Sequence, residues 1–245
     1  MKTFKIVMSA LAVMAGVLVV SPAANAQENG NRDENGKVVR GAYETNKFGD
    51  NWFIGAGAGV NSWLGNGASP KAGVAVDAFV GKWITPTVGV RMGWKGLKDG
   101  ASAKDGYTIA DEKFTYNSAH VDLLWNLSNL FSGYKETRTW NISVYPTFAY
   151  MNAAKNKEFG AGIGMLNNFR IGNRVGLYLD LSALTTKADF AGISPRPKTL
   201  AGVLPSATFG LTVNLGKTGF KRHSSVVPAI VPVPFTEAQY NNLQD

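Results

Sequence analysis

Hydrophobic and polar residues alternate along most of the chain between residues 51 and 217. Within each alternating segment every second position is apolar, which is the period of a β-strand with one apolar and one polar face. Turn-forming residues separate the segments. The pattern predicts eight strands, at about residues 51–63, 71–83, 87–97, 114–127, 140–152, 158–169, 174–185 and 206–216.

The connections between these strands alternate in length. Short turns are predicted at Thr85-Pro86 and Gly172-Asn173, whereas long polar stretches cover residues 98–113 and 187–205. Outer-membrane barrels have short periplasmic turns and longer external loops, and strands of this length cross a bilayer at the usual tilt. The connection 128–139 is long for a periplasmic turn, and the sequence gives no physical reason for its length.

The residue types on the two faces of the strands distinguish a membrane barrel from a soluble one. The apolar face is nearly free of charge, and only Lys82 falls on it, near a strand end. The other face collects glycine, small polar residues and charged residues. A soluble barrel with those charges around an apolar cavity would be unstable, because burying an unpaired charge is costly. We therefore predict an all-β fold, an eight-stranded antiparallel up-and-down transmembrane β-barrel.

The polar face of the strands would line the interior of the barrel. Eight strands leave an interior that side chains just fill, so charges there must be paired. Paired carboxylates and a histidine could perform acid–base chemistry. Their mid-strand positions favour a structural network instead, with Tyr145 and Tyr178 nearby by parity. The predicted lumen charge network consists of Asp77, Arg91, His120, Asp122, Arg174 and Asp180.

Aromatic residues gather near the predicted strand ends. Two belts of Trp, Tyr and Phe are expected where a barrel meets the two membrane interfaces, although ordinary core aromatics are the alternative. By strict alternation Trp83 falls on the face of its strand that points into the lumen, so its assignment to a belt stays undecided. The predicted belts are Trp52, Trp125, Trp140 and Phe169 on the periplasmic side, and Trp94, Phe148, Tyr150 and Phe159 on the external side.

The two ends of the chain differ from the barrel region of residues 51–217. Residues 1–26 have the basic start, apolar stretch and Ala-Asn-Ala site of a cleaved signal peptide; the apolar stretch is short for the alternative, a retained membrane anchor. Residues 27–50 are polar and predict a flexible periplasmic leader. Residues 218–245 are rich in proline and predict an extended periplasmic tail, which could bind a periplasmic or cell-wall partner.

Composition narrows the function classes further. The formal net charge is +8, but lysine and arginine are scattered and the chain is expected to be exported, so nucleic-acid binding is not expected. The chain has no cysteine, and its two histidines, His120 and His223, lie far apart in the sequence. No serine elbow, phosphate-binding loop or metal-ligand spacing is present. We expect no enzymatic activity, no metal and no cofactor.

Three stretches carry a resemblance to the outer-membrane barrels of the OmpA-like family. They are the first strand at residues 51–59, the fourth strand at 118–127, and the proline-rich segment after the eighth strand. The resemblance covers about residues 50–235. It implies a barrel with a charged interior, an envelope-stabilising role and exposed loops, and many members of the family continue into a peptidoglycan-binding domain.

The leading functional hypothesis is a structural barrel in the bacterial outer membrane, surrounded by outer-membrane lipid after signal-peptide cleavage. It would support envelope integrity and display its external loops, with adhesion as one use of them. A small porin-like channel for ions or solutes is the first alternative, and bilayer conductance discriminates between the two. A soluble secreted ligand-binding barrel is the second alternative, and it would be extracted without detergent.

Overall fold

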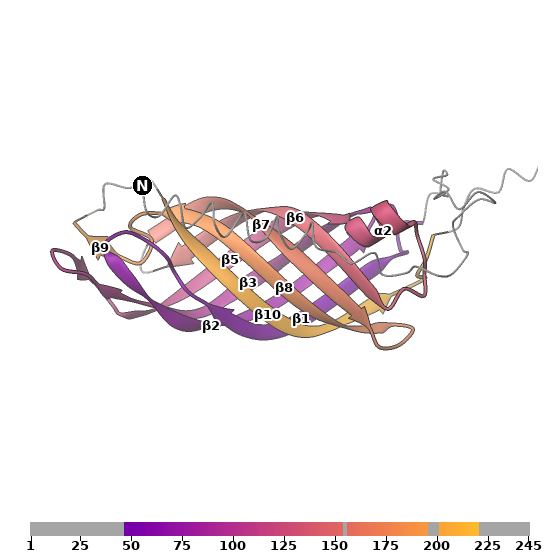
Figure 1. Ribbon diagram of the computed structural model, residues 1–245, viewed down its shortest axis with the longest axis horizontal. Coiled ribbons are helices and arrows are strands. Elements are labelled where there is room, and N and C mark those ends of the chain that lie inside the picture. Colours follow the sequence, from indigo (N-terminus) through magenta and orange to yellow (C-terminus); the bar gives the residue numbers. More distant parts are fainter. Residues whose placement is uncertain (1–46, 154–155, 196–200, 221–245) are drawn as a thin grey trace, which may run out of the picture.

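The computed structural model describes residues 47–153, 156–195 and 201–220. Eight long antiparallel strands close into one barrel in the order β1-β10-β8-β7-β6-β5-β3-β2 (Figure 1). This closed up-and-down order confirms the predicted fold. The strands are β1 Trp52–Asn61, β2 Ala68–Trp83, β3 Val88–Ala103, β5 Lys113–Asn126, β6 Trp140–Ala153, β7 Asn156–Arg170, β8 Val175–Lys187 and β10 Ala201–Leu215.

Both ends of the sequence extend beyond the part of the chain that the structure describes. The predicted signal peptide at residues 1–26 lies outside the described residues. So do residues 27–46 of the predicted leader and 221–245 of the predicted proline-rich tail.

The alternation of the sequence appears in the structure as an alternation of burial. In β5, exposed and buried residues follow one another without exception from Lys113 to Asn126. Val121 is 53% exposed on the outer wall, whereas its neighbour Asp122 is 1% exposed inside the barrel. The barrel therefore places its apolar residues outside and its charges inside, as successive side chains of a strand point to opposite faces.

The barrel has two different ends. The turn end carries the connections 84–87, 127–139 and 171–174, and it is also where the described chain enters at Asn51 and leaves at Gly216. The loop end carries the connections 62–67 and 104–112, together with residues 188–195, the described part of the connection between β8 and β10. In Figure 1 the loop end is on the left, beside β9, and the turn end is on the right, beside α2.

Three short elements lie in the connections, and the alternation of the sequence predicts none of them. Helix α2 (Leu127–Ser132) accounts for the unexplained length of the 128–139 connection, and the Asn126 side chain caps it by accepting from Asn129 N. At the loop end β4 (Thr108–Ile109) pairs with β9 (Ile193–Ser194). Within the described part of the chain, no helix is both long and apolar enough to cross a membrane.

Several strands are longer than the predicted segments. β3 continues to Ala103 and β10 begins at Ala201, both inside stretches predicted as polar loops. Their backbones still pair with neighbours, for example Gly100 with Lys113, so the ladders continue although the apolar alternation has ended. The β5–β6 ladder skips Tyr145 and Pro146 without any change of register, because proline has no N–H to donate to a ladder.

Candidate functional site

A layer of ion pairs crosses the middle of the lumen. The guanidinium of Arg91 on β3 bridges two carboxylates, with Nε 2.6 Å from Asp122 Oδ2 and Nη1 2.9 Å from Asp180 Oδ2. The phenolic hydroxyl of Tyr145 donates to the same Asp180 carboxylate, at 2.7 Å from Oδ1. The Arg91 guanidinium also lies over the ring of Phe79, 4.8 Å from its centroid. All five side chains are buried, so each charge is compensated inside the barrel.

Lys95 extends this layer toward the loop end. Its Nζ lies 3.4 Å from Asp180 Oδ1 and 3.8 Å from Asp77 Oδ2. The same Nζ donates to the hydroxyls of Ser182 and Ser206, at 3.3 Å and 3.4 Å. Lys95 lies on the lumen parity of its strand, so its place inside could have been predicted, yet the predicted network omitted it. The signal that would have found it is the Arg91-x-x-x-Lys95 spacing on one face of a strand.

His120 completes the central layer between two acidic residues. Its Nδ1 lies 3.1 Å from Asp122 Oδ2, and its Nε2 lies 3.8 Å from Asp77 Oδ1. The structure thus brings together five of the six predicted lumen residues. With Lys95 they form the central charge layer, which consists of Asp77, Arg91, Lys95, His120, Asp122 and Asp180.

Arg174 is the one predicted lumen residue that the structure excludes from the layer. The predicted strand began at residue 174, whereas β8 begins at Val175. Arg174 therefore falls in the turn that precedes β8, and it is exposed. Its backbone carbonyl accepts from Asn214 N. The prediction was wrong because an error of one residue at a strand end moves that residue out of the alternating pattern.

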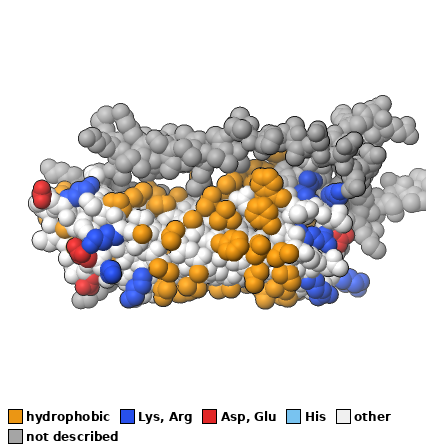
Figure 2. Space-filling model, turned by 60° about the horizontal axis from the view of Figure 1, so that its bottom comes forward, with side chains coloured by type: hydrophobic (Ala, Val, Ile, Leu, Met, Phe, Trp, Pro, Cys, Tyr) orange, Lys and Arg blue, Asp and Glu red, His pale blue; other side chains and the backbone are white. Residues whose placement is uncertain are grey.

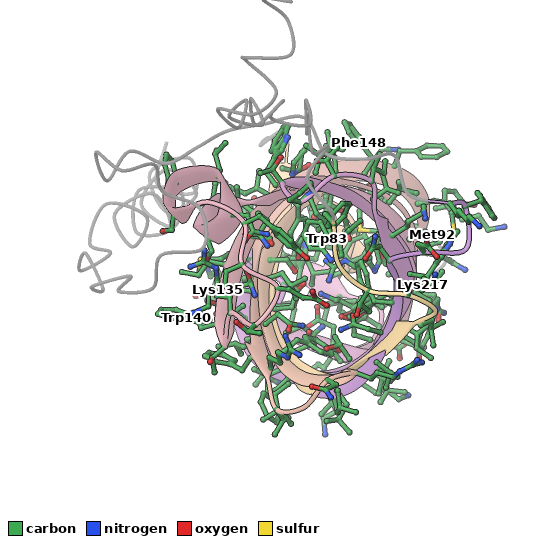
Figure 3. All side chains as sticks on the ribbon, turned by 90° about the vertical axis from the view of Figure 1, so that its right-hand side faces the viewer. Trp83, Met92, Lys135, Trp140, Phe148 and Lys217 are labelled. Carbon is green, nitrogen blue, oxygen red and sulfur yellow. The ribbon has the colours of Figure 1, made fainter. Side chains whose placement is uncertain are left out.

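An aromatic layer fills the lumen on the turn-end side of the charges. Phe79 packs edge-on against Tyr178 with ring centroids 5.1 Å apart, and Phe53 lies 6.0 Å from Trp83. Figure 3, which looks along the barrel from the turn end, shows Trp83 inside the ring of strands. Trp83 therefore belongs to the lumen, as its parity indicated. The turn-side layer consists of Phe53, Phe79, Trp83, Leu124, Tyr145, Leu166 and Tyr178.

A second apolar layer closes the lumen on the loop-end side. Trp63 is fully buried, and its Nε1 donates to Thr186 Oγ1 at 2.8 Å. The β8–β10 connection contributes to this layer, because Phe190 packs edge-on against Phe114. The loop-side layer includes Trp63, Ala68, Ala101, Phe114, Tyr116, Ala149, Met151, Ala153, Leu184, Phe190, Ala191, Ile193 and Leu204. Side chains thus fill the barrel from the loop end to the turn-side layer.

The outer wall is apolar between two charged ends. Figure 2 shows a band of hydrophobic side chains around the middle of the barrel, with lysine, arginine and acidic side chains toward both ends. Lys82, the one charge that the sequence pattern places on the apolar face, lies at the turn end, where its ammonium donates to the carbonyls of Phe48 and Asp50. The ammonium of Lys82 therefore lies at the end of the apolar band, where backbone carbonyls accept its hydrogen bonds.

The structure places the predicted belt residues on this outer wall. Near the turn end Trp140 stacks on Phe169 with ring centroids 5.9 Å apart. Farther toward the loop end Tyr150 lies 5.1 Å from Phe159, in the same register row as Trp94. Trp140 and Phe148 point outward in Figure 3. The exposed aromatics of the wall include Trp94, Trp125, Trp140, Phe148, Tyr150, Phe159 and Phe169, and Trp52 is partly exposed.

A closed barrel with an apolar exterior and an ion-paired interior is suited to a lipid environment rather than to water. The sequence is similar to Outer membrane protein 40 of Porphyromonas gingivalis (strain ATCC BAA-308 / W83), with 28% identity over 228 residues. The protein is a closed eight-stranded β-barrel that resembles transmembrane barrels. The match covers 86% of this chain and 58% of the relative, so the chain spans a little over half of the relative's length.

Comparison with solved structures finds other small barrels. Neisserial surface protein A matches with a TM-score of 0.47 and 9% sequence identity, over 67% of this chain and 97% of that one. The attachment invasion locus protein Ail of Yersinia pestis matches with a TM-score of 0.38 and 10% identity, over 68% of this chain and 99% of that one. No protein-family model matches the sequence.

Proposed function

We propose that the barrel is a closed structural element of the bacterial outer membrane, which supports the envelope and holds its loop end in an exposed position. The single observation that carries the proposal is the stacking of the central charge layer between two apolar layers. Such an interior stiffens the barrel, because each strand is tied to others through the lumen as well as through its ladders. The central charge layer then has a structural role rather than a catalytic one.

The filled lumen favours this proposal over a porin-like channel. A channel needs a continuous path of water, whereas the space found beside Arg91, Lys95 and His120 is only about 10 Å³. That is about the space that a single water molecule needs, far less than a continuous water path. Trp63 and Phe190 block the lumen toward the loop end, and Phe53 and Phe79 block it toward the turn end.

Conductance in a planar lipid bilayer tests the proposal. The purified full chain is expected to insert without producing ion-conducting steps. The double variant Arg91→Ala/Lys95→Ala removes the bulky cations of the central charge layer. Its matched control, Arg174→Ala, removes an exposed cation instead. Stable, ohmic conductance of the unmodified protein would favour the porin-like channel instead.

The location is tested separately, in cells. Membrane fractionation is expected to place the protein in the outer membrane and to require detergent for its release. Deletion of the gene is expected to increase sensitivity of the cells to detergents and bile salts, and expression of the full chain is expected to restore resistance. Release of the protein without detergent would support the soluble ligand-binding barrel, and an unchanged sensitivity would contradict the envelope role.

A further inference from the structure

The turn end of the barrel contains a cavity of about 150 Å³, which lies beyond the turn-side layer. Phe53, Trp83 and Leu166 belong both to that layer and to the cavity lining, so they form its floor. The connection between α2 and β6 forms part of the wall, and Lys135 lies at the rim in Figure 3. At about 30 Å³ per water molecule, the cavity has room for about five waters, for a small amino acid, or for the polar end of a larger ligand.

The walls of this cavity, which we name the turn-end cavity, are rich in amide side chains. Each asparagine amide supplies both hydrogen-bond donors and an acceptor, so the lining suits a ligand with several polar groups. The charges of the lining are those of Lys135, Arg138, Arg170 and Glu136, an excess of cations. The asparagines of the lining are Asn51, Asn126, Asn129, Asn141, Asn168, Asn173 and Asn214.

Two atoms of the lining have no hydrogen-bond partner, although they are buried: Oδ1 of Asn129 and Nε of Arg138. Asn129 is held in place, because its Nδ2 donates to Pro86 O at 2.7 Å and its backbone N donates to Asn126 Oδ1 at 2.8 Å. Buried polar atoms are nearly always paired in native proteins, so an unpaired acceptor and an unpaired donor on one cavity wall require an explanation.

Arg138 also lacks a counter-charge. Its Nη2 donates to the carbonyl of Gly133 at 2.6 Å. Partial burial lowers the pKa of the Arg138 guanidinium, and no carboxylate of the described residues opposes that effect. Arg170, by comparison, donates to the carbonyls of Gly172 and Glu136 and to the Asn173 side chain. Among the described residues of the lining, Arg138 is therefore a cation that is available to an anion.

We propose that the turn-end cavity binds a small polar ligand that carries a carboxylate together with a hydrogen-bond donor. The carboxylate would pair with the guanidinium of Arg138, the side chain best suited to carboxylate recognition. The donor, an amide N–H, a hydroxyl or an ammonium, would bond to Oδ1 of Asn129. Acidic amino sugars and free amino acids share this chemistry. The site does not depend on the proposed closed lumen, because the turn-side layer separates the two.

Calorimetric titration of the full chain in detergent micelles tests this site with three probes. N-Acetylmuramic acid carries the carboxylate on an amino sugar, alanine carries it on an amino acid, and N-acetylglucosamine is the matched sugar without it. We expect at least one of the two carboxylate ligands to bind, and the uncharged sugar to bind at least tenfold more weakly or not at all. Whichever of the two carboxylate ligands binds shows whether the site recognises an acidic amino sugar or a free amino acid.

Two variants with the same change of charge localise the binding. Arg138→Gln is expected to lower the affinity at least tenfold, because a hydrogen bond to a charged group is lost. Arg174→Gln, at the same end but outside the cavity lining, is expected to leave the affinity unchanged. Absence of binding by both carboxylates at millimolar concentration, or equal binding of N-acetylglucosamine, would overturn the proposal. Full affinity in Arg138→Gln would overturn the proposal as well. The comparison of the three ligands uses the unmodified protein, so it still tests the proposal if the variant fails to fold.

Discussion

Arg91 and Asp180 form an ion pair across the full width of the barrel, with Nη1 2.9 Å from Oδ2. Arg91 lies on β3 and Asp180 on β8, and these strands are four places apart in either direction around the ring. The pair therefore ties together opposite walls that share no backbone ladder. This connection depends on closure of the barrel, because the two residues lie 89 positions apart in the sequence.

Replacement of Arg91 tests this connection energetically. Arg91→Met removes the cation from between Asp122 and Asp180 and leaves each of these buried carboxylates without one of its charged partners. Loss of one partner of a buried pair typically costs about 3–5 kcal/mol in the free energy of unfolding. Urea unfolding in lipid vesicles measures the change. Arg174→Met is the control, and its free energy of unfolding should stay within about 0.5 kcal/mol of the unmodified protein, as expected for an exposed position. Similar stabilities of the two variants would contradict a structural role of the central charge layer.

The glycine opposite Tyr145 is predicted to position that ring. Tyr145 pairs with Gly164 on β7, and a Cβ at Gly164 would overlap the Tyr145 ring. Gly164→Ala should displace the hydroxyl from Asp180 and cost about 1–3 kcal/mol, as overpacking does. Gly172→Ala is the control, because a Cβ there meets nothing within 4 Å. Equal stability of both variants, measured by the same urea titration, would show that Tyr145 has room to move.

An added charge on the outer wall is predicted to destabilise the barrel more strongly the deeper it lies in the bilayer. Val121 lies on the outer wall beside Met92 and Phe148 in the register, one exposed position nearer the turn end of β5 than the row of Trp94 and Tyr150. Val121→Arg should cost about 2–4 kcal/mol, whereas Val175→Arg, at the turn end of β8, should cost about 0–1 kcal/mol. Folding yield and urea stability in lipid vesicles report both values. A Val121→Arg protein as stable as Val175→Arg would place that position outside the hydrocarbon region.

An exposed ion pair at the loop end gives a pH-dependent prediction. The hydrogen bond from Lys71 Nζ, 2.5 Å from Glu112 Oε2, lowers the pKa of the Glu112 carboxyl. Because this pKa is depressed, the stabilisation is present above the unfolded pKa of Glu112 and is lost as the pH falls through its folded value. Lys71→Met should return the pKa to the ordinary glutamate value in an NMR titration; an unchanged pKa would mean that the pair does not form in solution.

The sequence predicted the barrel because period-two alternation is a property of each strand by itself. The side chain of Asp122 points inward because its neighbours Val121 and Leu123 point outward, and no knowledge of the partner strands is required. The same reasoning correctly placed Trp83 on the lumen parity. It failed at Arg174, where one residue of boundary error changes the outcome.

Features that depend on contacts between distant segments were not predictable in this way. The β4–β9 pair joins residues 108–109 to residues 193–194. Helix α2 is a local element, but with six residues it shows no apolar periodicity that would predict it. Which lumen charges pair with one another also depends on strand register, since Arg91 reaches Asp180 only when the ring is closed. The turn-end cavity was missed for the same reason, because its asparagines come from separate strand ends.

The central claim is that a lipid-facing wall surrounds a filled interior, and spin labels at single cysteines test it most directly. The chain contains no cysteine, so Val121→Cys and Thr147→Cys each give one defined label site. Val121 is 53% exposed on the wall and Thr147 is 3% exposed inside. In lipid vesicles, oxygen dissolved in the bilayer should relax the label at position 121 strongly, and neither oxygen nor a water-soluble nickel complex should reach position 147. Relaxation of the label at 147 by the nickel complex, or protection of the label at 121 from oxygen, would contradict the account.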